Sequence, residues 1–341
     1  MKPDYRIYAN ESDITESIRN RATSISITDE IGTQSDSCSI ELADPKEEIA
    51  PPPQGAVLRV YLGYEGKLAD MGRYFVDSVS ISGPSDKIKI EAKASPFVDS
   101  KAGGVTALQS RKQRSFPDGI TIKTLVETIA ADHGMTAEVE SSVANIVLGH
   151  IDQTDQSDID LLTRSTVEKN VSIKAADKKI IAVPRSKALR GNSLAAPSVS
   201  LKKSDVSSWD IKVSQRQRYD KTITKWHDLG AGEEKTFSFG KDQGTVYRDP
   251  KLYQNEQEAK LAAQSQGEES SRNGVEISLK LPGRTDLFAE GKISLSGFRA
   301  VMNGDWCIKK VTHSMSSSGF TSTIDAQAFT ADAASKYEKF S

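Results

Sequence analysis

Hydrophobic and polar residues alternate through most of this 341-residue chain. Between residues 24 and 94, apolar side chains recur at every second position, as at Ile25 and Ile27, which is the period of a strand with one buried face. Turn signals such as Pro51–Pro53 separate the runs. Several short strands at this spacing predict a small antiparallel β-barrel-like domain over residues 1–100. The other apolar positions expected to face its core are Cys38, Ile40, Leu42, Leu58, Val60, Leu62, Val79, Ile81, Ile88 and Ile90.

A helical period replaces this alternation after residue 121. Apolar residues there follow the spacing of one buried helix face, and Gly134 is placed to end the helix because glycine readily adopts a positive φ. A strand is expected at Thr136–Val139. A second helix is expected after Ser157, whose hydroxyl can cap it together with Asp160. The apolar positions of the two helices are Ile122, Leu125, Val126, Ile129 and Ala130, then Ile159 and Leu162.

A hairpin is predicted directly after the second helix. Val171 and Ile173 alternate with polar residues, a polar turn follows, and Pro184 closes the next apolar run. The apolar residues of that run are Ile180, Ile181 and Val183. Residues 101–190 are therefore expected to form a central αβ domain with short helices.

Strand alternation returns in the C-terminal part of the chain. It is interrupted by a turn-rich stretch, Asp228–Asp249, and by a third helix at about residues 255–273 that Asn255 can cap. The apolar stripe of this helix consists of alanines, which bury little area, so Leu252 and Leu261 are expected to complete its packing. The alanines are Ala259, Ala262 and Ala263. The alternating strand positions are Val199, Leu201, Trp209, Ile211, Val213, Val275, Ile277, Leu279, Leu281, Ile293, Leu295, Trp306, Ile308, Val311 and His313.

These patterns predict a mainly β (α+β) protein in which two small antiparallel β-barrel-like domains flank the central αβ domain. The residues between the two segments of the second β domain are expected to leave that domain as an excursion, and the helix of this excursion is expected to pack on the central domain. The expected boundaries are 1–100 for the first β domain, 101–190 for the central domain, 191–234 and 275–330 for the second β domain, 235–274 for the excursion and 331–341 for a tail.

Composition and charge argue against several classes of protein. The chain has 45 Lys and Arg against 47 Asp and Glu, a formal net charge of −2, without the basic excess typical of nucleic-acid binders. It has neither a run of about 18 apolar residues nor an apolar signal segment at its start, so membrane anchoring and export by a cleaved signal are not expected. Cys38 and Cys307 lie far apart and outside any CxxC spacing, which is typical of a protein that folds in a reducing cytoplasm.

Residues with catalytic potential do not combine into a motif. The four histidines lack the spacing of metal ligands, and adjacent glutamates point apart instead of flanking a substrate. No phosphate-binding loop and no nucleophile elbow occurs. We therefore expect no catalytic, cofactor-binding or metal-binding residues, no cofactor and no enzyme activity. The residues weighed are His133, which fits a helix C-terminus, His150, His227 and His313, and the pairs Glu47–Glu48, Glu233–Glu234 and Glu268–Glu269.

Two further features have an ordinary reading and a functional one. Trp209, Trp226 and Trp306 could stack on sugars, but strand-like positions favour core packing. The polar segment 100–118 carries basic residues that could contact an anionic partner, although a solvated loop or linker is favoured. These basic residues are Arg111, Lys112 and Arg114.

Three stretches together resemble one known family. In the centre, a helix ending in Ala-x-x-His-Gly precedes a helix that starts with Asp-Gln-Ser-Asp. Near the C-terminus, the chain contains the motifs Gly-x-Trp-x-Ile-x-x-Val-x-His and Gly-Phe-x-Ser-Thr. The segment Pro51–Val79 is a third and looser match. This set resembles the late control protein D family, the baseplate hub proteins of contractile-tailed phages, which are related to the hub part of type VI secretion spike proteins. The matching residues are Ile129, Ala130, His133, Gly134, Gln153, Asp155, Gln156, Ser157, Asp158, Leu162, Arg164, Val183, Pro282, Gly283, Leu287, Gly291, Gly297, Phe298, Gly304, Trp306, Ile308, Val311, His313, Gly319, Phe320, Ser322 and Thr323.

The resemblance implies a structural function in the tail baseplate of a virion. Hubs of this family are trimers whose six barrels match the sixfold tail tube on one side and receive the threefold spike on the other, around a lumen for DNA. It implies for this chain a homotrimer, assembled in the bacterial host cytoplasm, that contacts a tail spike protein, a tail tube or tube-initiator protein and other baseplate proteins. Neither specific nucleic-acid binding nor stable membrane anchoring is expected.

Two alternatives stay open. The first is the hub of a phage-derived injection device, such as a tailocin or a type VI secretion-like apparatus. Full-length type VI spikes carry a C-terminal needle of short repeats, which is not seen before Ser341, so a separate spike protein is expected. The second alternative is a tail-associated cell-wall hydrolase.

Overall fold

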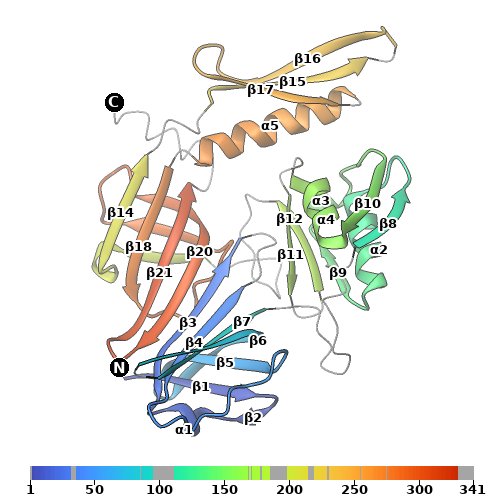
Figure 1. Ribbon diagram of the computed structural model, residues 1–341. Helices are drawn as coiled ribbons and strands as arrows, with labels where there is room; N and C mark the ends of the chain where they lie inside the picture. The colour runs from blue at the N-terminus through green and yellow to red at the C-terminus, as the bar shows by residue number, and fades with distance from the viewer. Residues whose placement is uncertain are drawn as a thin grey trace.

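The structure is a computed structural model that describes residues 2–31, 36–84, 86–94, 111–167, 169, 171–176, 179–184, 198–213, 219–228, 230–253, 255–273 and 275–328. Figure 1 shows two β units one above the other, a central unit of short helices and strands beside them, and a long helix against a separate small sheet. Most described elements are strands, so the prediction of a mainly β chain is confirmed.

The first β unit folds around an apolar core. Its elements are β1 (Pro3–Ala9), β2 (Ser12–Asp13), α1 (Thr15–Ile18), β3 (Ala22–Glu30), β4 (Ser37–Ala43), β5 (Val57–Tyr64), β6 (Lys67–Ser82) and β7 (Lys87–Lys93). Alternate residues such as Ile27 and Ile40 enter the core opposite Val60 and Ile7, as their spacing predicts. The expectation for Ile81 is wrong: it is 66% exposed, because the end of β6 reaches past β5 and pairs only with β7 among the described strands.

The second β unit has its own core. Its elements are β13 (Ser198–Lys202), the 3-10 turn η2 (Lys203–Asp205), β14 (Ser208–Val213), β18 (Val275–Pro282), β19 (Lys292–Ser296), β20 (Gly304–Ser316) and β21 (Gly319–Ala328). The apolar residues predicted for β18 are all buried, and Trp306 is the largest side chain of the core, with 1% exposure. Its indole N–H donates to the carbonyl of Met302 at 2.9 Å, so this polar atom is satisfied without water.

The two β units share one sheet, which the sequence did not predict. β3 pairs antiparallel with β20, from Ser24 opposite Ser316 to Glu30 opposite Lys310. The result is a 13-stranded sheet with the continuous run β14-β18-β21-β20-β3-β4-β7-β6 through both units. We call these eight strands the arc.

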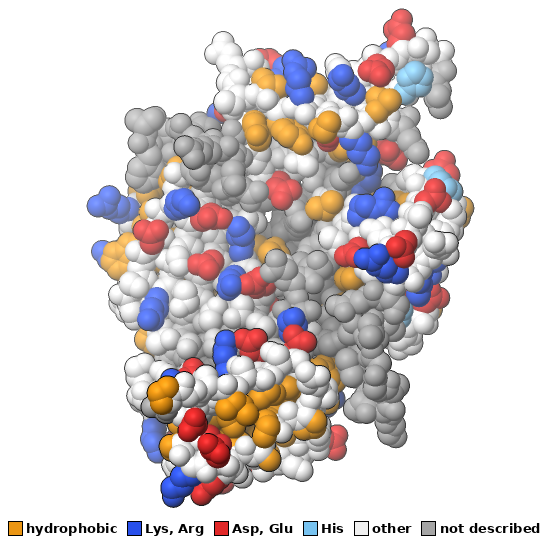
Figure 2. Space-filling model, in the orientation of Figure 1, with side chains coloured by type: hydrophobic (Ala, Val, Ile, Leu, Met, Phe, Trp, Pro, Cys, Tyr) orange, Lys and Arg blue, Asp and Glu red, His pale blue; other side chains and the backbone are white. Residues whose placement is uncertain are grey.

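The arc presents a polar face on the side away from both cores. Two rows of hydroxyl residues cross β21, β20, β3 and β4, and cross-strand ion pairs surround them, including Lys87–Glu41 at 2.8 Å and Lys310–Glu30 at 2.5 Å. Figure 2 shows both signs of charge interspersed with uncharged groups over β14, β18, β21 and β20. The rows are Thr323, Thr312, Thr28 and Ser37, then Thr321, Ser314, Ser26 and Ser39.

The central unit has the predicted helices and more strands than predicted. Its elements are β8 (Arg111–Phe116), α2 (Ile122–Asp132), β9 (Thr136–Val139), α3 (Ser141–Ala144), β10 (Ile151–Ser157), α4 (Asp158–Val167), β11 (Val171–Ala176) and β12 (Lys179–Pro184). The apolar stripe of α2 is buried, and Gly134 ends that helix with a φ of 62°, as predicted. The β11–β12 hairpin is also confirmed. β8, α3 and β10 were not predicted.

The excursion is a folded unit of three strands and one helix. Its elements are β15 (Lys221–Asp228), β16 (Glu233–Gly240), β17 (Val246–Tyr253) and α5 (Glu256–Asn273). The expected boundary at residue 234 is wrong for β15, because this strand pairs with β16 and β17 and not with the second β unit. The turn-rich stretch consists largely of strands.

Helix α5 packs chiefly on this small sheet, and it also contacts the central unit, where Ser265 Oγ donates to the carbonyl of Val167 at 3.5 Å. The predicted cap is present, since Asn255 Oδ1 accepts from the N–H of Glu258 at 2.9 Å, and the alanine stripe is buried. Leu252 is 48% exposed and Tyr253 takes the core position instead. At Gly267 a side chain would meet the Phe239 ring, because an added Cβ would lie 2.6 Å from it.

Two sequence predictions lie outside the described residues. Most of the expected boundary loop, 186–200, and the expected tail, 331–341, fall in this part of the chain.

We predict that Trp306→Ala lowers the free energy of unfolding by about 3–5 kcal/mol, because it leaves a cavity in the second core. Chemical denaturation followed by circular dichroism measures this loss. A variant with unchanged stability that fails only to bind a partner would contradict the core assignment.

Candidate functional site

Strand β8 places basic side chains on the inner face of the central unit. Lys112, Arg114 and Phe116 alternate along it and share one face, and β8 pairs antiparallel with β10. The prediction of a solvated loop is therefore wrong for Arg111–Phe116. The period of two in this segment was the available signal, but polar residues at the inward positions obscured it.

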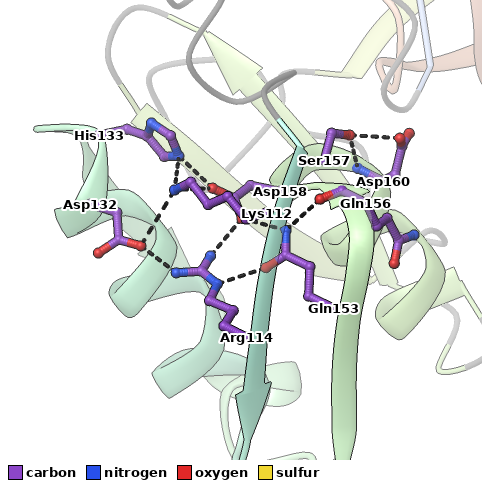
Figure 3. Close-up of polar contacts among 9 residues, drawn as sticks. All are labelled: Lys112, Arg114, Asp132, His133, Gln153, Gln156, Ser157, Asp158 and Asp160. Atoms are coloured by element: carbon purple, nitrogen blue, oxygen red, sulfur yellow. Dashed lines mark hydrogen bonds and ion pairs between the residues drawn. The ribbon is translucent and has the colours of Figure 1, made fainter.

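The side chains of Lys112 and Arg114 converge on the buried carboxylate of Asp158, the first residue of α4 (Figure 3). Its Oδ1 accepts from Arg114 at 2.5 Å and from Gln153 at 2.8 Å. Its Oδ2 lies 2.7 Å from both Lys112 Nζ and His133 Nε2. Both oxygens are thus occupied by groups from β8, β10 and the C-terminal end of α2.

A second layer of contacts fixes the cations around Asp158. Arg114 also pairs with Asp132 and donates from Nε to the side-chain oxygen of Gln153 at 2.7 Å. The amide of Gln153 donates in turn to the carbonyl of Gln156 at 2.8 Å. The cluster therefore connects two strands and two helices through one charged centre.

The charge of Asp158 is stabilised in spite of its burial. Burial alone would raise the pKa of this carboxyl, but hydrogen bonds from Lys112, His133 and Gln153, with the positive charge of Arg114, hold the pKa below its ordinary value. The group stays ionised at neutral pH. With both oxygens occupied and no exposure to solvent, it can hold elements together but offers no acceptor to a substrate.

The predicted helix cap lies beside this cluster. Ser157 Oγ accepts from the N–H of Asp160 at 3.2 Å and donates to the Asp160 carboxylate at 2.6 Å. The predicted contact between Ser157 and the first turn of α4 is therefore confirmed. Leu162 is buried as predicted, and Leu161, which was not predicted, is buried with it.

The structure does not bring the four histidines together. His133 ends α2, as predicted, and also contacts Asp158. His313 is buried in the second β unit, between Ser322 Oγ at 2.9 Å and the carbonyl of Leu287 at 3.1 Å, and burial lowers its pKa. His150 lies 3.1 Å from the exposed Asp152.

The other sequence candidates also separate. Trp306 is buried in the second core, whereas Trp226 packs beside the excursion core. Trp209 is 42% exposed, so the expectation of core packing was wrong for this residue. Its ring contacts Phe298 edge to face, with the two ring centroids 5.6 Å apart. The Lys203 ammonium lies over the same ring, 4.9 Å from its centroid.

The described residues form neither a metal site nor a membrane-spanning helix. Among them, no group of three or more His, Cys, Asp and Glu side chains is arranged to hold a metal ion. Across the same part of the chain, the helices are too short or too polar to cross a membrane.

Comparison with known proteins defines the class. The sequence profile of the phage tail baseplate hub family (GPD) matches residues 106–319, which include the Asp158 cluster and most of the second β unit. The chain therefore belongs to the phage tail baseplate hub family. It is 27% identical to the probable baseplate hub protein of Escherichia phage P2 over 370 residues, covering 96% of this chain and 93% of that protein.

Solved structures share this fold. A 43 kDa tail protein of prophage MuSo2 from Shewanella oneidensis superposes with a TM-score of 0.70 at 15% identity, over 95% of this chain and 98% of that one. An Escherichia coli component of the type VI secretion system superposes with a TM-score of 0.57 at 12% identity, over 96% of this chain and 76% of that one. The resemblance proposed from the sequence is confirmed.

We predict that Asp158→Asn lowers the free energy of unfolding by about 3–5 kcal/mol at pH 7, because it removes the buried charge that Lys112 and Arg114 surround. Since the folded pKa is depressed, the stabilisation is present above the unfolded value of about 3.9 and is lost as pH falls through the folded pKa. Urea denaturation from pH 7 to pH 3 should show the difference from wild type shrinking at the acidic end.

The control for this experiment is Asp155→Asn in β10, which makes the same chemical change at an exposed ion pair. In this pair Arg111 Nη1 lies 3.0 Å from Asp155 Oδ2. This substitution should cost less than about 1 kcal/mol. Equal losses for the two variants, or a loss at Asp158 that does not change with pH, would contradict the role given to this carboxylate.

Replacing the helix cap should have a smaller effect. Ser157→Ala should cost about 1 kcal/mol, because the N–H of Asp160 loses its acceptor. Ser165→Ala inside the same helix should be neutral or slightly stabilising, since alanine is the better helix former. A loss at Ser157 no larger than at Ser165 in denaturant titrations would exclude a capping role.

Proposed function

We propose that this hub protein forms a homotrimer in which the two β units of each subunit act as β-barrel-like domains of a six-unit ring. The ring joins the sixfold tail tube to the threefold central spike, and its lumen is part of the path by which DNA leaves the particle. The proposed partners are the spike protein, the tube or tube-initiator protein and other baseplate proteins. Assembly takes place in the host cytoplasm before the baseplate becomes part of the virion.

The observation that carries this proposal is the polar face of the arc. One continuous surface runs through both β units, and no apolar core cluster of the described residues lies on it. A passage for DNA must not hold its phosphates, and clustered unpaired Lys or Arg would do so. On this face Lys87, Lys89, Lys309 and Lys310 are each paired with an acid, as Lys89 with Glu91 at 2.6 Å and Lys309 with Glu276 at 2.9 Å.

The likeness to a type VI secretion component favours a second candidate, the hub of a phage-derived injection device. The proposed ring and spike junction would be the same, but the particle would carry no DNA. Purified particles that contain the hub distinguish the two, because a phage tail is attached to a DNA-filled head. A tail-associated cell-wall hydrolase is the remaining candidate, and lysis of peptidoglycan in a zymogram by the purified chain would favour it.

We predict that the purified protein, alone or with the spike protein of the same phage or prophage, has three times the chain mass of 37.1 kDa in light scattering. The spike should bind with one spike trimer per hub trimer. A chain that stays monomeric at all concentrations, with the spike present as well, would overturn the proposed function.

A further inference from the structure

The small sheet of the excursion has one covered side and one bare side. Helix α5 covers the first, where Thr224 Oγ1 donates to the carbonyl of Ala259 at 2.8 Å and Trp226 packs beside the alanine stripe. The intervening residues of β15 point to the other side, because successive side chains of a strand alternate. Figure 1 shows no described element over that side. We call it the outer face, and it carries Lys221, Ile223, Lys225 and His227 from β15 with Arg248 and Leu252 from β17.

Strand pairing places basic and apolar side chains next to one another on the outer face. Ile223 lies opposite Arg248, and Lys225 lies opposite Leu252. Leu252 is 48% exposed, and Val246 at the other end of β17 is 43% exposed. Figure 2 shows Lys and Arg side chains beside apolar ones over this sheet. Exposed apolar groups among polar ones are typical of a surface that contacts another molecule.

Two cations of the outer face have no partner among the described residues. Lys225 and Arg248 are exposed, and neither forms an ion pair with the part of the chain that the structure describes. Other lysines of the same sheet are paired, Lys221 with Asp242 at 3.0 Å and Lys235 with Asp228. Two neighbouring positive charges therefore remain for an anionic partner.

Acidic residues at both ends limit the length of the anion that the outer face accepts. Glu234 lies opposite His227 at one end, and the exposed Asp242 pairs with Lys221 at the other. Between these ends the strand measures about 20 Å, at about 3.3 Å per residue. The acids repel a long polyanion such as duplex DNA or an anionic membrane surface. A short acidic protein segment with an apolar residue to cover Leu252 fits both the charge and the length.

A hollow continues the positive surface toward the central unit. It has a volume of about 320 Å³ and adjoins Leu252. One acid, Glu258, lines it against four basic side chains. The outer face therefore does not end at β17 but extends into the junction of the excursion with the central unit. The four basic residues are His150, Arg164, Lys169 and Lys251.

We propose that the outer face and this hollow bind an acidic segment of another baseplate protein. Carboxylates of the segment lie on Lys225 and Arg248, and an apolar side chain covers Leu252. This inference rests on the proposed function, because it takes the hub to be assembled with other baseplate proteins. The sheet β16-β15-β17 is separate from the sheet that contains the arc, so this contact and the proposed ring use different surfaces.

The first experiment measures binding with overlapping synthetic peptides that cover the spike protein and the other baseplate proteins encoded with this chain. Fluorescence anisotropy gives the affinity of each labelled peptide for the full chain. We expect a peptide with carboxylates next to an apolar residue to bind. Its binding should weaken from about 0.1 M to 1 M salt, because the Debye length falls from about 10 Å to 3 Å. Binding by no such peptide, or equal binding by basic peptides, would overturn the proposal.

Charge reversal locates the contact. Lys225→Glu and Arg248→Glu should each weaken binding of that peptide, and the double variant should weaken it by about tenfold or more, since attraction becomes repulsion at two positions. The matched control is Lys260→Glu, an exposed lysine of α5 that also has no ion partner among the described residues. It lies on the covered side of the sheet and should bind like wild type. Equal affinities of wild type and the double variant would exclude the outer face as the site.

A reciprocal change tests whether the charges meet directly. A peptide whose carboxylates are replaced by lysine should lose affinity for wild type and regain it for the double variant. Failure to regain affinity in this combination counts against direct pairing at Lys225 and Arg248.

Leu252→Ser tests the apolar part of the contact. Because Leu252 is largely exposed, the melting curve should not change, whereas peptide affinity should fall several-fold. The control is Val147→Ser, which is 55% exposed on the central unit and should keep wild-type affinity. Unchanged binding by Leu252→Ser would remove the apolar anchor from the proposal.

Two further probes address other classes of partner. Short duplex DNA and phosphatidylcholine vesicles containing phosphatidylserine should show no binding that depends on Lys225 and Arg248. Binding of either probe to wild type, lost in the double variant, would show a general polyanion site and overturn the proposed protein contact.

Light scattering of the same proteins separates this inference from the proposed function. The double variant should form the trimer as wild type does, and loss of its trimer would assign these residues to the subunit contact and overturn the inference alone. A wild-type chain that never trimerises would overturn the proposed function, whereas peptide binding that depends on Lys225 and Arg248 would still support this contact.

Discussion

The pairing of β3 with β20 is the contact on which the architecture depends. It joins residues 284 positions apart, as at Thr28 and Thr312, whose hydroxyls are 3.4 Å apart. Without it the two β units would be separate bodies on a long connection, and the arc would have two open edges in addition to those at its ends. Such distant contacts carry a large loop-closure cost and form slowly. The β3 edge therefore stays open during synthesis until the last strands of the chain are available.

The sequence was informative wherever one face of an element is apolar. The α2 stripe, the β18 alternation and the caps at Ser157 and Asn255 follow local rules that need no knowledge of the rest of the fold. Their buried faces in the structure are those that the spacing predicts. Gly134 likewise predicted where helix α2 ends, because glycine readily adopts a positive φ.

Where the sequence failed, a distant partner decides the structure. The sequence of β8 is typical of a loop because its inward residues are Lys112 and Arg114. These side chains can be partly buried because they pair with Asp158, 44 to 46 positions later in the chain. Ile81 and Trp209 alternate correctly, but they lie in the two end strands of the arc and stay largely exposed. The boundary of the excursion depended on the partner of β15, which periodicity does not specify.

The two hydroxyl rows of the polar face have a consequence for motion. Serine and threonine hydroxyls rotate and can either donate or accept, so a wall of them has no fixed polarity for a passing molecule to recognise. Lining the proposed lumen, these rows would hold a layer of exchangeable water, and every position along the wall would interact with a charged backbone in nearly the same way. An even surface of this kind has few energy barriers, so a long polymer could slide past it with little friction, whatever its sequence.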